Sequence, residues 1–178
     1  VEQQDRFARP ATPQGHRENQ RHNDTSALDC DQQATRIDPI GVEPDEYLFI
    51  SPYVLDPNDE RIMYFAGGSM VWRNSDLTQI PLGREDSTSV NWDSLSYSRQ
   101  SGSQITSIAA ARVPAHRVYY GTSGGAMFRM DNANVGDPVP VDVSNGLSRG
   151  ATLNAICIDR RNGDHVLACF SNYGVISL

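Results

Sequence analysis

Paired carboxylates are the first chemistry to look for in this acidic chain, because hydrolysis of a glycosidic bond needs two of them at a defined separation. Asp and Glu number 22 against 15 cationic residues, and the formal net charge is −7. The aspartates at expected strand ends and turns are Asp56, Asp59, Asp137, Asp142, Asp159 and Asp164. Solvated or turn-capping aspartates are typical of such places. The sequence therefore predicts no catalytic pair.

Two arginines occupy equivalent places in successive copies of a repeated phrase. Arg73 ends Met70-Val71-Trp72-Arg73, and Arg129 ends Met127-Phe128-Arg129. Guanidinium groups bind carboxylates bidentately, which makes both residues candidate ligand-binding residues. The alternative is a structural one, in which each arginine covers apolar surface at the end of its strand and keeps its head in water.

Two aromatic residues, Trp92 and Tyr97, lie in the polar stretch Gly83–Gly102. Aromatics on an exposed loop are suited to sugar stacking or protein contact, because they combine apolar area with a polar handle. Both are candidate ligand-binding residues. The alternative is that the stretch folds back and caps the domain.

Histidine and cysteine spacing indicates no metal site. The histidines are scattered at 16, 22, 116 and 165, and no Cys-x-x-Cys pair is present. The cysteines are Cys30, Cys157 and Cys169, an odd number that does not describe a disulfide framework. Cys157 and Cys169 lie symmetrically about Gly163, so they are either small buried thiols or a cross-strand bridge. We expect no cofactor.

Charge and hydropathy exclude several classes of partner. A net charge of −7 and a pI near 4.9 argue against binding to nucleic acid or to an anionic membrane surface, since both need clustered positive charge. No apolar run approaches the roughly 18 residues that span a bilayer, so no membrane insertion is expected. Residues 1–36 are polar with isolated apolar residues, which predicts an N-terminal arm outside the core.

The elements that position these residues follow from a phrase that is written three times. Its copies are Tyr47–Asp76, Ile105–Asp131 and Leu153–Leu178. Each has an apolar run, a polar turn, a second apolar run, glycine and a third short run. Equivalent residues recur at a period of about 50, near the length of a four-stranded propeller blade.

An all-β fold is expected from residue 37 onward, because short runs rich in Val, Ile, Tyr and Phe alternate with Gly, Pro, Asn and Asp. We predict three β-propeller blades at about 47–82, 104–143 and 152–178. The expected fourth strand of the first blade is Leu77–Leu82, and that of the second is Val139–Val143. The expected third strand of the last blade is Tyr173–Leu178, after which the chain ends.

The repeated phrase resembles the sialidase-type (BNR or Asp-box) propellers, a group that includes the VPS10/sortilin-like repeats and the xyloglucanase-like hydrolases. The resemblance rests on FISPYVLDPNDERIMYFAGGSMVWRNSDL and ITSIAAARVPAHRVYYGTSGGAMFRMDN and covers about 36–178. Of the family's Asp box, Ser75 and Asp76 are present, whereas its glycine and tryptophan are absent. The box is a folding element in this family and not a catalytic site, so the loss of part of this motif does not argue against any catalytic role.

What the resemblance implies is a non-catalytic binding or scaffold module of an exported bacterial protein, extracellular or at the cell surface, with a carbohydrate or protein partner. The alternative is a fragment of a glycoside hydrolase, although no glycine-rich acid-bearing loop of the xyloglucanase type is found.

Three blades do not close a ring, since propellers have four to eight. Either the chain belongs to a larger propeller, or copies of it associate. Ala34–Ile40 reads as an unpaired strand that could complete the third blade and allow two chains to form one ring.

Overall fold

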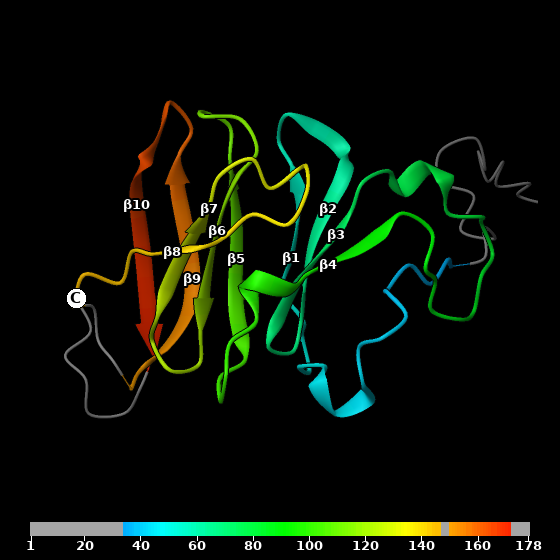
Figure 1. Ribbon diagram of the computed structural model, residues 1–178, viewed down its shortest axis with the longest axis horizontal. Helices are drawn as coiled ribbons and strands as arrows, with labels where there is room; N and C mark the ends of the chain where they lie inside the picture. The colour runs from blue at the N-terminus through cyan, green and yellow to red at the C-terminus, as the bar shows by residue number, and fades with distance from the viewer. Residues whose placement is uncertain (1–33, 147–149, 172–178) are drawn as a thin grey trace, which may run out of the picture. The chain divides into compact units, whose positions relative to one another are not determined.

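The computed structural model describes residues 34–146 and 150–171, whose strands form three antiparallel sheets (Figure 1). Within those residues the helical elements are three short 3-10 turns, η1 (Pro44–Glu46), η2 (Leu77–Gln79) and η3 (Ser96–Ser98). The predicted all-β class is confirmed. Most of the predicted N-terminal arm, with Cys30, His16 and His22, lies outside the described residues.

Sheet 1 has four strands in sequential order: β1 (Tyr53–Asp56), β2 (Asp59–Gly67), β3 (Met70–Asn74) and β4 (Trp92–Leu95). The predicted fourth strand at Leu77–Leu82 is wrong. Asp76 accepts a hydrogen bond from Thr78 N (3.0 Å) and so caps η2, and the chain returns to β3 only at Trp92.

Sheet 2 repeats that order with β5 (Ile105–Ala111), β6 (Arg117–Thr122), β7 (Met127–Met130) and β8 (Val141–Asp142). All four strands were predicted from the sequence. Sheet 3 pairs β9 (Thr152–Asp159) with β10 (Asn162–Ser171), and the predicted strand Tyr173–Leu178 lies outside the described residues.

The turns form where the sequence indicates them, for local chemical reasons. Between β1 and β2, Asp56 Oδ1 accepts a hydrogen bond from the backbone N of Asn58 (2.8 Å), as an Asx turn requires. Gly68 and Gly125 precede the third strands of sheets 1 and 2 with φ of +62° and +81°. Residues other than glycine would have a strained backbone at these positions.

Two apolar clusters hold the sheets against one another. The larger lies between sheets 1 and 2 and is centred on Tyr64, Val71 and Tyr120, all fully buried. The smaller joins sheet 2 to sheet 3 through Tyr119, Met127 and Leu153. Alternate residues of each strand enter these layers, as a period of two dictates.

The sheets approach one another through their first and second strands. β1 and β2 pack against β5, and β5 and β6 pack against β9. The first strands β1, β5 and β9 therefore run side by side through the three sheets (Figure 1).

The other face of sheet 1 is covered by the chain that precedes it. The ring of Tyr47 lies 6.1 Å from that of Phe65, and Trp92 Nε1 donates to the carbonyl of Ile37 (2.8 Å). Gly67 allows the close approach of Trp72, because a Cβ there would meet Trp72 Nε1 at 2.7 Å.

Ala34–Ile40, expected to be an unpaired strand, already has partners. Its backbone bonds residues 84–88 in parallel, through Arg36 N to Arg84 O (2.8 Å) and Thr88 N to Asp38 O (3.0 Å). The expectation that this segment is unpaired is therefore wrong. Among the described residues no helix has the length and hydropathy needed to cross a membrane.

Candidate functional site: a pocket where three turns meet

The turns that follow the first strands of the three sheets are bonded to one another. Asn58 Nδ2 donates to the carbonyl of Ala111 (3.2 Å), which ties the turn of sheet 1 to that of sheet 2. Gly163 N donates to Val113 O (2.6 Å), and Tyr119 OH donates to Gly163 O (2.7 Å), which tie sheet 2 to sheet 3. This end of the fold is therefore rigidly positioned.

A buried carboxylate strengthens the first of these junctions. Asp56 is fully buried, and its Oδ2 lies 2.9 Å from Tyr64 OH and 2.9 Å from His116 Nδ1. Burial raises the pKa of Asp56, but hydrogen bonds from His116, Asn58 and Tyr64 outweigh it and hold the pKa below its ordinary value. An ionised carboxylate only accepts, so Nδ1 of His116 carries the hydrogen.

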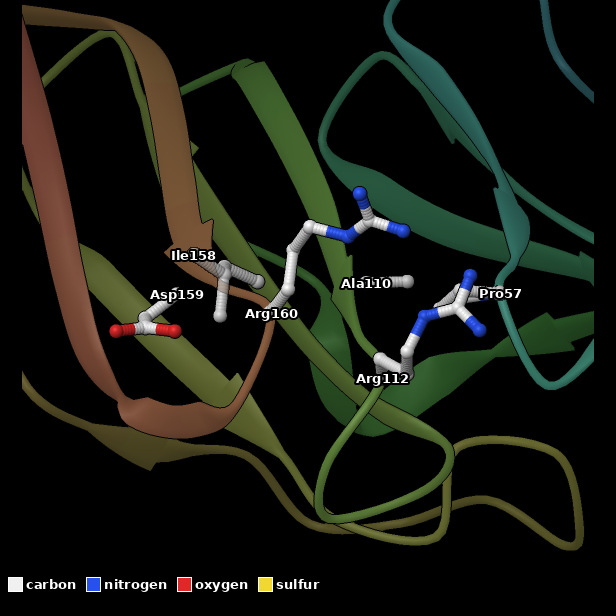
Figure 2. A pocket seen from close by; sticks show the side chains of 6 residues that line it. All are labelled: Pro57, Ala110, Arg112, Ile158, Asp159 and Arg160. Carbon is white, nitrogen blue, oxygen red and sulfur yellow. The ribbon is translucent and has the colours of Figure 1, made fainter.

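A shallow pocket of about 110 Å³ opens where the three turns meet (Figure 2). It is lined by Pro57, Ala110, Arg112, Ile158, Asp159 and Arg160. Pro57, Arg112 and Arg160 are the residues directly after β1, β5 and β9. One position of the structural repeat thus contributes a residue from every sheet.

Arg112 and Arg160 are exposed, and within the described residues neither side chain makes a hydrogen bond or ion pair. The side chain of every other described arginine makes a hydrogen bond or an ion pair. These residues are Arg36, Arg61, Arg73, Arg84, Arg99, Arg117, Arg129 and Arg161. The two described arginines whose side chains make no hydrogen bond or ion pair to described residues therefore share one pocket.

The pocket's own carboxylate is directed elsewhere. Asp159 Oδ1 accepts a hydrogen bond from the backbone N of Arg161 (2.8 Å) and lies 3.7 Å from its Nε. Figure 2 shows that this carboxylate points away from the guanidinium groups of Arg112 and Arg160, which lie on either side of Ala110. The pocket is left with uncompensated positive charge over an apolar floor.

Arg73 has a structural position. Its side chain is 6% exposed, and the guanidinium donates to the carbonyls of Ala133 (3.0 Å) and Gly136 (2.8 Å) and to Asp93 (2.7 Å). The expected alternative, with its head in water, is wrong. The guanidinium is buried and used to tie sheet 1 to the loop after β7.

Arg129, at the equivalent place in sheet 2, is only half-buried and forms an ion pair with Asp131 at 3.2 Å. Asp131 also accepts from Arg117, which bonds Asp164 of the third sheet at 2.5 Å. Arg73 and Arg129 therefore do not share a site, and neither lines the pocket.

Trp92 and Tyr97 are separated as well. Trp92 begins β4, is half-buried and lies edge-on to Phe65 at 6.2 Å, so it is not an exposed loop aromatic. Tyr97, in η3, is 62% exposed, and its backbone N lies 3.4 Å from Asp137 Oδ1. Of the candidate residues taken from the sequence, Tyr97 has the most freely accessible side chain.

Cys157 and Cys169 are free thiols on the exposed face of the β9–β10 hairpin. Cys157 pairs with Leu167 and Cys169 with Ala155, so the two cysteines are diagonal neighbours. The expectation of small buried thiols is wrong. Among the described residues no group of histidine, cysteine and acidic side chains is arranged to hold a metal ion.

The sequence did contain a signal for the pocket that residue types alone do not reveal. Arg112 and Arg160 lie in turns, where arginine is ordinary, and only the alignment of strand ends shows that both follow the first strand of their repeat. Comparisons of the chain with protein-family models, with curated proteins and with solved structures found no match.

Proposed function

We propose that the chain is a non-catalytic binding module of the β-propeller type, which contacts a carbohydrate or protein partner through the turns at one end of its sheets. The observation that carries this proposal is the pocket of Arg112 and Arg160, where donors without a partner are held on turns that are bonded to one another. Loops on a rigid scaffold are the usual place for binding residues.

The propeller architecture is supported by the order and packing of the strands. Sheets 1 and 2 each have four antiparallel strands in sequential order, which is the topology of a blade. Their first and second strands approach the neighbouring sheet, as expected of blades packed around an axis.

A non-catalytic role is supported by the state of the acids. Asp159, which lines the pocket, is engaged by Arg161, and Asp56 is buried among Tyr64, His116 and Asn58. Within residues 34–146 and 150–171, neither is paired with a second carboxylate at the pocket. An extracellular or cell-surface location in a bacterium is part of the proposal and rests on the resemblance to sialidase-type repeats.

The proposal includes further sheets, from a larger propeller or from other copies of the chain. Large apolar side chains are exposed at both terminal sheets: Phe49 before β1, Tyr53 in β1 and Leu167 on β10. Such residues are costly to leave in water and are typical of contact surfaces. Light scattering of Leu167→Glu beside the parent chain tests the association of copies: an oligomer that the substitution dissociates supports it, and a monomeric parent chain contradicts it and leaves the larger propeller.

The binding function is tested with the purified chain on a glycan array, and by affinity capture followed by calorimetry with the purified captured protein. Saturable binding to a glycan or to one such protein is expected. Blank results in both assays contradict the module. Turnover of chromogenic glycosides would contradict the non-catalytic module and would show that the chain is an enzyme.

A further inference from the structure

We propose that the pocket of Arg112 and Arg160 binds a glutamate or aspartate side chain presented by a protein partner. This inference rests on the proposed binding function and chooses a protein over a carbohydrate. It concerns a single anchoring contact within whatever larger surface the partner covers.

Charge selects an anion. Two exposed guanidinium groups flank Ala110, and no described side chain satisfies their donors. A guanidinium fork matches the two oxygens of a carboxylate and binds it bidentately. The chain as a whole carries a net charge of −7, so attraction of an acidic group must be local to this pocket.

Volume selects a side chain over a whole molecule. The pocket holds about 110 Å³, whereas pockets for entire small-molecule ligands begin at roughly 300 Å³. A carboxylate with one or two methylene groups needs far less space than a sugar ring with its hydroxyls. The pocket therefore takes a group that projects from a larger surface.

The floor selects a carboxylate on a carbon stem over inorganic phosphate. Pro57, Ala110 and Ile158 supply the apolar part of the lining. Burial of methylene groups against such a floor lowers the free energy of binding. A phosphate, which has only oxygen atoms at its surface, would lose hydration there and gain no hydrogen bond from the floor in exchange. The methylenes of Glu or Asp meet the floor while the carboxylate meets the two arginines.

Preorganisation makes a small pocket useful. The turn after β1 is held by Asp56 and Asn58, and the turns after β5 and β9 are joined by the bond from Gly163 N to Val113 O. Little ordering of the backbone is left to occur on binding, which preserves affinity in a contact of this size.

The test is fluorescence anisotropy at low ionic strength with a labelled hexaglutamate peptide, and with labelled hexaglutamine as the neutral match. Saturable binding of hexaglutamate alone is expected. The double variant Arg112→Gln/Arg160→Gln should weaken it at least tenfold. Arg112→Lys/Arg160→Lys should weaken it less than the glutamine pair, because lysine keeps the charge but not the fork.

Arg99→Gln is the matched control. Arg99 is exposed and contacts Ser69 Oγ at 3.2 Å, outside the pocket, so its variant removes one positive charge elsewhere and should stay within twofold of the parent affinity. Urea midpoints equal to the parent's establish that the variants are folded, which is expected because Arg112 and Arg160 have no side-chain partners among the described residues.

Three results overturn the inference: no saturable hexaglutamate binding by the parent chain, equal weakening by Arg99→Gln, or preferential displacement of the peptide by oligogalacturonate or inorganic phosphate. A protein partner that binds the double glutamine variant as well as the parent chain leaves the binding module standing and removes the pocket from it. Absence of both partner and peptide binding contradicts both proposals.

Discussion

The carboxylate of Asp56 lies 2.9 Å from Nδ1 of His116, a residue 60 positions later in the chain. Asp56 ends the first strand of sheet 1, and His116 lies in the turn between the first two strands of sheet 2. A buried acid thus joins equivalent turns of successive sheets, at the same end of the fold as the pocket.

Removal of this acid should destabilise the domain strongly. Asp56→Ala leaves the hydroxyl of Tyr64, a fully buried residue, without its acceptor and breaks the Asx turn at Asn58. Unsatisfied buried groups of this kind cost about 2–4 kcal/mol in the free energy of unfolding. Urea denaturation measures the change. In the control Asp59→Ala, which removes a surface pair with Arg61, the loss should be much smaller because the pair is exposed to solvent.

Acid should weaken the attachment of the segment before sheet 1. Burial raises the pKa of Asp38, but hydrogen bonds from Arg36, Tyr47 and Ser87 outweigh it and lower the pKa from 3.8 to about 2. The folded state therefore binds the proton less tightly than the unfolded state. The stability contributed by Asp38 is complete above the unfolded pKa and is lost as the pH falls from about 4 to 2.

Asp38→Asn tests this origin of the pH dependence. Unfolding free energies measured between pH 6 and pH 2 should fall less steeply for the variant than for the parent chain. An unchanged slope would mean that other carboxylates account for the loss, with Asp56 the next to examine because its pKa is also lowered.

Arg73 is expected to act on stability and not on binding. Arg73→Lys keeps the charge but loses the fork that reaches Ala133, Gly136 and Asp93 together, and should cost about 2–3 kcal/mol. Arg129→Lys, whose ion pair is half-exposed, should cost less than 1 kcal/mol. Thermal or urea unfolding measures both. Loss of partner binding by folded Arg73→Lys would instead return this residue to the ligand site.

The junction of sheets 2 and 3 should show compensation between Gly121 and Leu153. A Cβ at Gly121 would lie 2.6 Å from Leu153 Cδ2, so Gly121→Ala should cost about 1–3 kcal/mol by overpacking. Leu153→Ala opens a cavity and should cost about 2–4 kcal/mol. The double variant should lose at least about 0.5 kcal/mol less than the sum of the two. Strict additivity in a urea cycle would contradict the contact.

Cys157 and Cys169 should both react in the folded protein. Their side chains are exposed, and diagonal placement on the hairpin leaves each thiol without a bond to the other. In a Cys30→Ser background, native alkylation should add two labels by mass spectrometry. A mass that shows one internal disulfide, or labelling only after denaturation, would contradict this placement.

The sequence was most informative where a residue type acts locally. The turn at Asp56–Asp59 and the glycines at 68 and 125 were predicted because Asx side chains and positive φ are properties of the residues themselves. The strands of sheet 2 were predicted because apolar runs and turns alternate there. The β class and the strand order follow from such signals.

Features that depend on distant partners were missed. The strand β4, Trp92-Asp93-Ser94-Leu95, has no apolar alternation, and it is a strand because β3 offers it an edge. Arg73 was predicted either to bind a ligand or to keep its head in water. Its buried position was missed because its carbonyl acceptors lie at Ala133 and Gly136, 60 and 63 residues away. The pocket of Arg112 and Arg160 belongs to the same class, since it exists only when three turns are brought together.

The two ends of the row of three sheets differ in how far they are covered. Tyr47 and the backbone of Ile37 occupy the face that precedes β1, while Leu167, Cys157 and Cys169 leave the opposite end exposed among the described residues. Sheet 1 is therefore partly covered by its own chain, whereas the described residues leave the outer face of sheet 3 uncovered. A chain lengthened by a second copy of residues 104–151, inserted before Thr152, meets an apolar neighbour at each new junction and should gain stability with each added unit, as linear arrays do.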